Sequence, residues 1–102
     1  MPNVEIEKVT LARNQIGPLL DRLIVELEAE GCATQRAYFN RIRHHLSVAH
    51  DDWELTTPII ELTSSPAIGF QLSSPAAAIL SRILKKASHI VQDLEGVRPE
   101  VH

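Results

Sequence analysis

The spacing of apolar residues between Thr34 and Trp53 is the feature that most constrains the fold of this chain. On a helix, which turns by about 100° per residue, these side chains fall on a single face. They are Tyr38, Phe39, Ile42, Leu46, Ala49 and Trp53, and they include three of the four aromatic residues of the chain. Aromatic side chains bury large areas. The pattern therefore predicts a helix over residues 34–53 at the centre of the core, with Thr34 as its N-cap.

A second segment with apolar residues at helical spacing precedes this one. Its apolar positions are Ile16, Leu19, Leu20, Leu23, Ile24 and Leu27. Because a proline ring clashes with the preceding turn of a helix, Pro18 fits best at the first helical position, directly after Gly17. The pattern therefore predicts a helix that starts near Pro18. A kinked helix that starts at Thr10 is the alternative.

The helix with the clearest boundaries is predicted over residues 75–95. Ser74 serves as its N-cap, Pro75 occupies its first turn, and Gly96 ends it. Its apolar positions are Ile79, Leu80, Ile83, Leu84, Ala87, Ile90, Val91 and Leu94. Residues 97–102 then form a frayed tail.

Two segments allow more than one structure. Residues 4–9 alternate only in part, so they form either a short strand or an ordered extension. In the middle of the chain, we favour a short helix that Thr57 caps and that begins at Pro58, followed by a loop that buries the apolar side chains of residues 68–72. The alternative is a small β-hairpin over residues 60–72, where apolar residues alternate with polar ones.

These elements indicate an all-α fold, a small antiparallel helical bundle formed by residues 1–102 as a single domain. The bundle has three main helices and an irregular or short helical middle segment. A net charge of −3 and an isoelectric point near 5.9 argue against general affinity for nucleic acid or anionic membranes. The single cysteine, Cys32, cannot form an internal disulfide. No apolar run approaches the ~18 residues of a membrane span, and we expect a cytoplasmic protein.

A group of potential metal ligands lies near the centre of the chain. It contains His44, His45, His50, Asp51 and Asp52. On one continuous helix, however, His44 faces away from the apolar stripe while His45 and His50 flank it on opposite sides. The three rings cannot converge on one ion, so we predict neither a metal site nor a cofactor.

Residues 43–50 have a spacing that is used in catalysis. Arg43 and His50 are seven positions apart, which places them on the same face of a continuous helix. The segment resembles the signature of HEPN-type ribonucleases, which are small helical bundles that often cleave RNA at a dimer interface. The resemblance covers eight residues. It implies that Arg43 would hold the phosphate and that His50 would transfer a proton or position water. RNA would then contact the face that carries Arg36 and Arg43.

A second resemblance concerns His44 and the two residues that follow it. The sequence His44-His45-Leu46 is similar to the start of the motif of histidine phosphotransfer domains, which present one exposed histidine on a helical bundle. The resemblance implies that His44 would accept a phosphoryl group. The chain departs from that motif at Ser47 and Val48, which replace a basic residue and a glycine, and Val48 would obstruct a response regulator.

We favour a third hypothesis, a non-catalytic oligomerisation or protein-interaction module with a regulatory role. The helix over residues 75–95 has more apolar positions than a three-helix bundle of this size covers. The excess face predicts a homodimer or a partner protein. A nuclease that uses Arg43 and His50, and a phosphotransfer module that uses His44, are the alternatives. No motif indicates which partner or ligand the chain binds.

Overall fold

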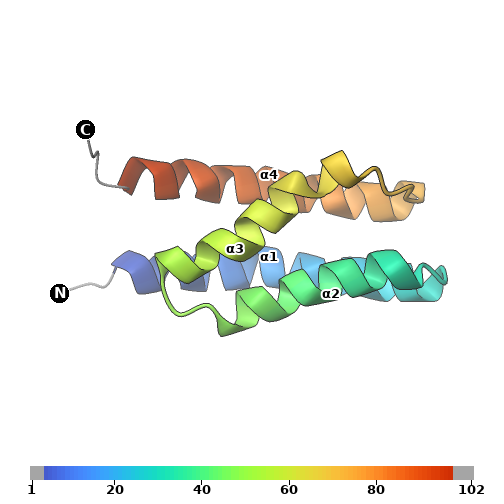
Figure 1. The fold of residues 1–102 in the computed structure, drawn as a ribbon, viewed down its shortest axis with the longest axis horizontal. Coiled ribbons are helices and arrows are strands. Elements are labelled where there is room, and N and C mark those ends of the chain that lie inside the picture. The colour runs from blue at the N-terminus through green and yellow to red at the C-terminus, as the bar shows by residue number, and fades with distance from the viewer. Residues whose placement is uncertain (1–3, 98–102) are drawn as a thin grey trace.

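The computed structural model describes the backbone of residues 4–97 and the side chains of residues 8–92. Within that part of the chain it contains four α-helices and no strand, so the predicted all-α bundle is confirmed. The helices run alternately up and down the long axis, as Figure 1 shows. They are α1 (Val4–Ala29), α2 (Ala33–Val48), α3 (Asp52–Ser64) and α4 (Ser74–Val97), and a short 3₁₀ helix, η1 (Ser65–Ile68), follows α3.

The core lies between the four helices, and α1 packs most extensively against α2 and α4. Phe39 is its largest fully buried side chain, and the rings of Tyr38 and Phe70 lie 5.1 Å and 6.1 Å from it between centroids. The predicted helical stripes supply most of the core. Its buried members include Ile16, Leu19, Leu20, Leu23, Leu27, Phe39, Ile42, Leu46, Ile83, Ala87 and Ile90.

Helix α1 is much longer than the sequence pattern predicts. It begins at Val4, so residues 4–9 are part of this helix, and the alternative of a short strand there is wrong. Pro18 lies inside the helix and not at its start, which places the structure closer to the alternative of a helix that already runs from Thr10. Pro18 is exposed, whereas its neighbours Leu19 and Leu20 are buried. Packing of the apolar face therefore holds the helix together across a residue that disfavours it.

We expect Pro18→Ala to stabilise the protein. Alanine restores the backbone donor that proline lacks and removes the clash with the preceding turn, an effect of about 3 kcal/mol in helix interiors. Part of this gain is offset because proline restricts the unfolded chain by about 0.4–1 kcal/mol. Denaturant titration should show a net increase of roughly 1–3 kcal/mol. Pro58→Ala is the matched control, because Pro58 is also inside a helix but is buried, so alanine forfeits its packing there. A Pro18→Ala protein less stable than the wild type would contradict this interpretation.

Helix α2 ends five residues before the position that the apolar pattern predicts. Ala49 leaves the helix with an extended backbone (φ −68°, ψ 133°), and its side chain is buried. The Arg13 guanidinium, from α1, donates hydrogen bonds to the backbone oxygens of Leu46, Ser47 and Ala49. These are carbonyls that a helix end leaves without partners, and a cation is favoured beside them. The predicted Thr34 cap is wrong, because Cys32 occupies the N-cap position and makes no side-chain cap bond.

The middle of the chain forms a short helix followed by a connecting segment, as favoured from the sequence, but the helix starts earlier than predicted. The helix there, α3, starts at Asp52 and contains Pro58 in its interior, so Thr57 is not a cap. The β-hairpin over residues 60–72 is wrong as well, because η1 and a connecting segment occupy this region. Gly69, at a φ of 81°, ends η1 in the left-handed conformation that favours glycine. Of the side chains predicted to be buried here, Phe70 and Leu72 pack against the core and Ile68 is exposed.

Helix α4 differs from the prediction only at its ends. Ser73, and not Ser74, accepts the hydrogen bond from the backbone N–H of Ala76 at 3.2 Å, and its hydroxyl also donates to Glu30, in the turn that follows α1, at 2.5 Å. Hydrogen bonding between the two side chains of Glu26 and Glu30 raises the pKa of Glu26 and lowers that of Glu30, and the hydrogen bond from Ser73 also lowers the pKa of Glu30. Gly96 lies inside the helix, which runs to Val97. The rest of the predicted tail lies outside the described residues.

Candidate functional site

The corner between α2 and α3 is built by two acidic residues that flank Trp53. The side chain of Asp51, at the N-cap of α3, accepts a hydrogen bond from the backbone N–H of Glu54 at 2.9 Å. The Glu54 carboxylate in turn accepts one from the backbone N–H of His50 at 2.7 Å. This reciprocal arrangement is a variant of the capping box, and both carboxylates lie where the helix dipole favours negative charge. Trp53 is thereby placed in the first turn of α3.

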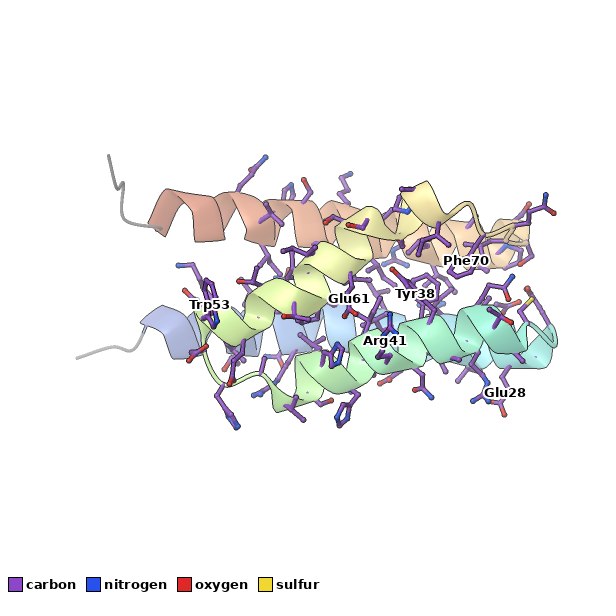
Figure 2. All side chains as sticks on the ribbon, viewed as in Figure 1. Glu28, Tyr38, Arg41, Trp53, Glu61 and Phe70 are labelled. Atoms are coloured by element: carbon purple, nitrogen blue, oxygen red, sulfur yellow. The ribbon has the colours of Figure 1, made fainter. Side chains whose placement is uncertain are left out.

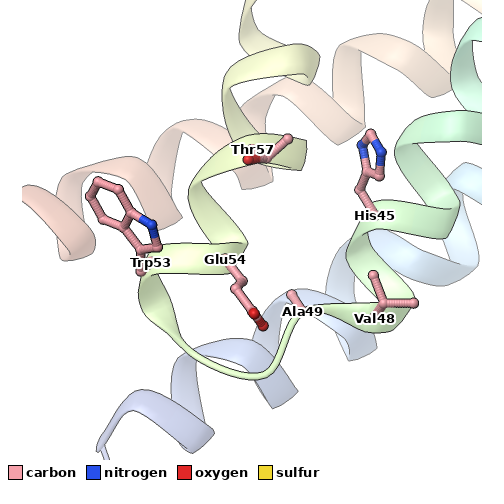
Figure 3. A pocket seen from close by; sticks show the side chains of 6 residues that line it. All are labelled: His45, Val48, Ala49, Trp53, Glu54 and Thr57. Carbon is pink, nitrogen blue, oxygen red and sulfur yellow. The ribbon is translucent and has the colours of Figure 1, made fainter.

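Trp53 is 82% exposed, the most exposed large apolar residue among those described. Its side chain borders a shallow groove of about 270 Å³ between the end of α2 and the start of α3. Figure 3 shows the residues that line this groove, which are His45, Val48, Ala49, Trp53, Glu54 and Thr57. Val48 is 48% exposed, and Ile60, two helical turns after Trp53 on the same face of α3, is 55% exposed. We call the groove together with Ile60 the Trp53 surface.

The exposure of Trp53 corrects its predicted place in the core. The apolar pattern places Trp53 on the helix that contains Phe39, but α2 ends at Val48 and Trp53 belongs to α3. Burying a large apolar side chain is worth about 1.5–3 kcal/mol, which this conformation of the isolated chain forgoes. The spacing of Asp51 and Glu54, which is that of a capping box, was a signal in the sequence that a new helix starts here.

A network around Glu61 holds α3 against α2 and so fixes the position of the groove. The Glu61 carboxylate accepts a hydrogen bond from His45 Nδ1 at 2.8 Å and forms an ion pair with Arg41 Nε at 3.5 Å. Its backbone oxygen accepts a hydrogen bond from the Tyr38 hydroxyl at 3.0 Å. Burial raises the pKa of Tyr38, and the charge of Glu61 adds to this, so the hydroxyl stays protonated as a donor. Figure 2 shows Glu61, Tyr38 and Arg41 together between the two helices, with Trp53 at the start of α3.

The structure separates the residues of the ribonuclease-like segment. Arg43 lies on α2, where its Nε pairs with Asp21 of α1 at 2.8 Å and its Nη1 donates to Ser47 at 2.6 Å. His50 lies in the connection after α2 and is exposed. The premise that both residues project from one continuous helix is therefore wrong. Catalysis by this pair stays a prediction, in which a phosphate would compete with Asp21 for Arg43.

The other predicted site residues are also dispersed. His44 is exposed on α2, as a phosphoacceptor requires, whereas His45 is held by Glu61. The face predicted to contact RNA is less basic than the sequence indicates, because Arg43 is paired with Asp21, although Arg36 remains at its edge. Within the described part of the chain, no group of three histidine, cysteine or acidic side chains is arranged to hold a metal ion. The helices of that same part include none that is long and apolar enough to cross a membrane.

The capping interaction predicts a specific pattern of stabilities. Asp51→Ala removes the acceptor for the Glu54 N–H and should cost about 1 kcal/mol of unfolding free energy. Asp51→Asn should lower the unfolding free energy by only about a few tenths of a kcal/mol, since asparagine caps about as well as aspartate. Thermal or denaturant unfolding of the two variants measures the difference. Equal losses for both would show that the charge of Asp51, and not its cap bond, is what matters.

Comparison with known proteins gives no relative for this arrangement. No protein-family profile, no curated protein and no solved structure matches the chain.

Proposed function

We propose that this chain is a non-catalytic protein-interaction module that binds its partner through the Trp53 surface. The observation that supports this proposal is a tryptophan 82% exposed beside an apolar groove. Tryptophan is among the residues most enriched at the energetic centres of protein interfaces, because its ring covers a large area and loses little conformational freedom. Isolated apolar side chains are common on surfaces, but here Val48 and Trp53 line one groove, and Ile60 follows Trp53 two turns later on α3.

The rigidity of the surface also supports binding. Arg13 fixes the end of α2, Asp51 fixes the start of α3, and Glu61 ties the two helices together. A surface that is already in place loses less conformational entropy when a partner binds. The geometry agrees less well with a catalytic pair, since Arg43 is paired with Asp21 and His50 lies beyond the end of α2.

The proposed interaction face, the Trp53 surface, differs from the face that the sequence pattern predicts. The sequence places the excess apolar surface on the helix over residues 75–95, where Ile83, Ala87 and Ile90 are in fact buried against the other helices. Among residues 74–92, none of the large apolar side chains is exposed. We therefore propose that the partner contacts the exposed apolar area at the α2–α3 corner instead.

Site-specific crosslinking tests the proposal. A photoreactive phenylalanine analogue placed at position 53, in living cells that produce the chain, should form a covalent adduct with one defined polypeptide. The same analogue at Ile68, which is 49% exposed but lies away from the groove on η1, is the matched control. An adduct at position 53 that is absent at position 68 supports the proposal. No adduct at position 53, or the same adducts at both positions, would overturn it.

A further inference from the structure

The charged residues in the second half of this chain are segregated along the sequence. Residues 44–81 contain the acidic residues Asp51, Asp52, Glu54 and Glu61 but no lysine or arginine. Residues 62–92 contain Arg82, Lys85 and Lys86 but no acidic residue. A molecule of net charge −3 thus has a distinctly acidic segment followed by a distinctly basic one.

Two acidic residues, Asp51 and Glu54, form an acidic rim beside the groove: Glu54 lines it, and Asp51 caps the helix that carries Trp53. The charge of Glu61 is compensated by Arg41, and His45 Nδ1 also contacts its carboxylate. Asp51 and Glu54 flank Trp53, and the bonds that their carboxylates accept come from backbone N–H groups, which leave their charge in place. An exposed indole flanked by carboxylates attracts a cationic side chain, both by charge and through the face of the ring.

The basic charge lies on the outer face of α4. Arg82, Lys85 and His89 follow one another at intervals of three and four residues, which places them on the same side of the helix, and all three are exposed. Neither Arg82 nor Lys85 forms an ion pair with any of the described residues, whereas Arg41 and Arg43 on α2 do. We call Arg82, Lys85 and His89 the basic stripe. The first turn of α3 starts near the end of the molecule at which α4 finishes, as Figure 1 shows.

We propose that the occupant of the Trp53 surface is the basic stripe of a second copy of this chain. This inference rests on the proposed function and names the partner. In a two-fold symmetric dimer, each Trp53 surface meets the basic stripe of the other copy, so both complementary contacts form at once. The indole of Trp53 then stacks against a lysine or arginine of the other copy, and the carboxylates of the rim complete the contact.

Charge reversal and mixing test this pairing. Wild-type chain should sediment at twice its 11.4 kDa mass at high concentration. Glu54→Lys and Lys85→Glu should each weaken self-association roughly tenfold or more, because each places like charges in contact twice per dimer. An equimolar mixture of the two variants should recover the wild-type affinity, since in the mixed dimer the two reversed charges meet each other and the second contact stays native. Arg22→Glu, an exposed reversal on α1, is the control and should leave the affinity unchanged.

Each alternative outcome is decisive. Lys85 is exposed, so Lys85→Glu leaves the fold intact, and a Lys85→Glu chain that dimerises as tightly as the wild type would overturn the inference. A wild type that stays monomeric at the highest attainable concentration would also overturn it. If the analogue at position 53 then crosslinks to a different polypeptide, the proposed function stands and only the identity of the partner is wrong. If nothing is crosslinked at position 53, both fail.

Discussion

Phe39→Ala is expected to lower the free energy of unfolding by about 3–5 kcal/mol, the usual effect of truncating a fully buried phenylalanine. Phe39 has no exposed surface and contacts the rings of Tyr38 and Phe70, so its removal leaves a cavity between α2 and the segment that precedes α4. A domain of this size is stable by about 5–15 kcal/mol in total. Denaturant titration followed by circular dichroism should therefore show a protein close to the limit of folding at room temperature.

Two control variants separate this cavity effect from a general sensitivity to mutation. Phe39→Leu keeps most of the volume and should cost much less, about 1.5 kcal/mol or below. Val25→Ala, at an exposed position of α1, should change stability by no more than about 0.5 kcal/mol. A Phe39→Ala protein that loses less than about 1 kcal/mol would show that the core is not arranged around this ring.

Trp53→Ala is expected to leave stability unchanged and to abolish most binding. The side chain is exposed and alanine favours the helix slightly more, so the unfolding free energy should stay within about 0.5 kcal/mol of the wild type. Binding to the partner that is crosslinked at position 53 should weaken by roughly 30-fold or more, which corresponds to the loss of about 2 kcal/mol that defines an interface hot spot. Sedimentation equilibrium measures this change if the partner is a second copy.

Ile68→Ala is the matched control for this variant. Ile68 is also a large exposed apolar residue, but it lies on η1 and not in the groove. The Ile68→Ala chain should bind the partner as tightly as the wild type does. A Trp53→Ala chain that binds normally, or one that loses several kcal/mol of stability, would contradict the role given to Trp53.

The buried faces of the helices could be predicted from the sequence, but several of their ends could not. Apolar spacing reports directly which residues face the core, so Leu20, Phe39 and Ile83 were correctly predicted as buried. Spacing does not report where a helix stops when neither glycine nor proline marks the end. The end of α2 depends on Arg13, more than thirty residues earlier in the sequence, which binds its last carbonyls.

At the two prolines inside helices, the local rules predict a helix boundary where the helix in fact continues. Local rules exclude Pro18 and Pro58 from helix interiors, yet packing of the surrounding apolar residues holds both helices through them. The site was missed for a related reason. Local spacing predicts one continuous helix over residues 43–50, and it shows neither the break before His50 nor the pairing of Arg43 with Asp21.

The emission of Trp53, the only tryptophan of the chain, tests the central claim most directly. In dilute solution, where the chain is monomeric, the emission should resemble that of free indole and should be fully accessible to acrylamide, a neutral quencher that the acidic rim does not repel. As the complex forms, the emission should shift to shorter wavelengths and become protected from the quencher. A protected, blue-shifted emission from the monomer would instead place the indole inside the fold, and the surface proposed for binding would not exist.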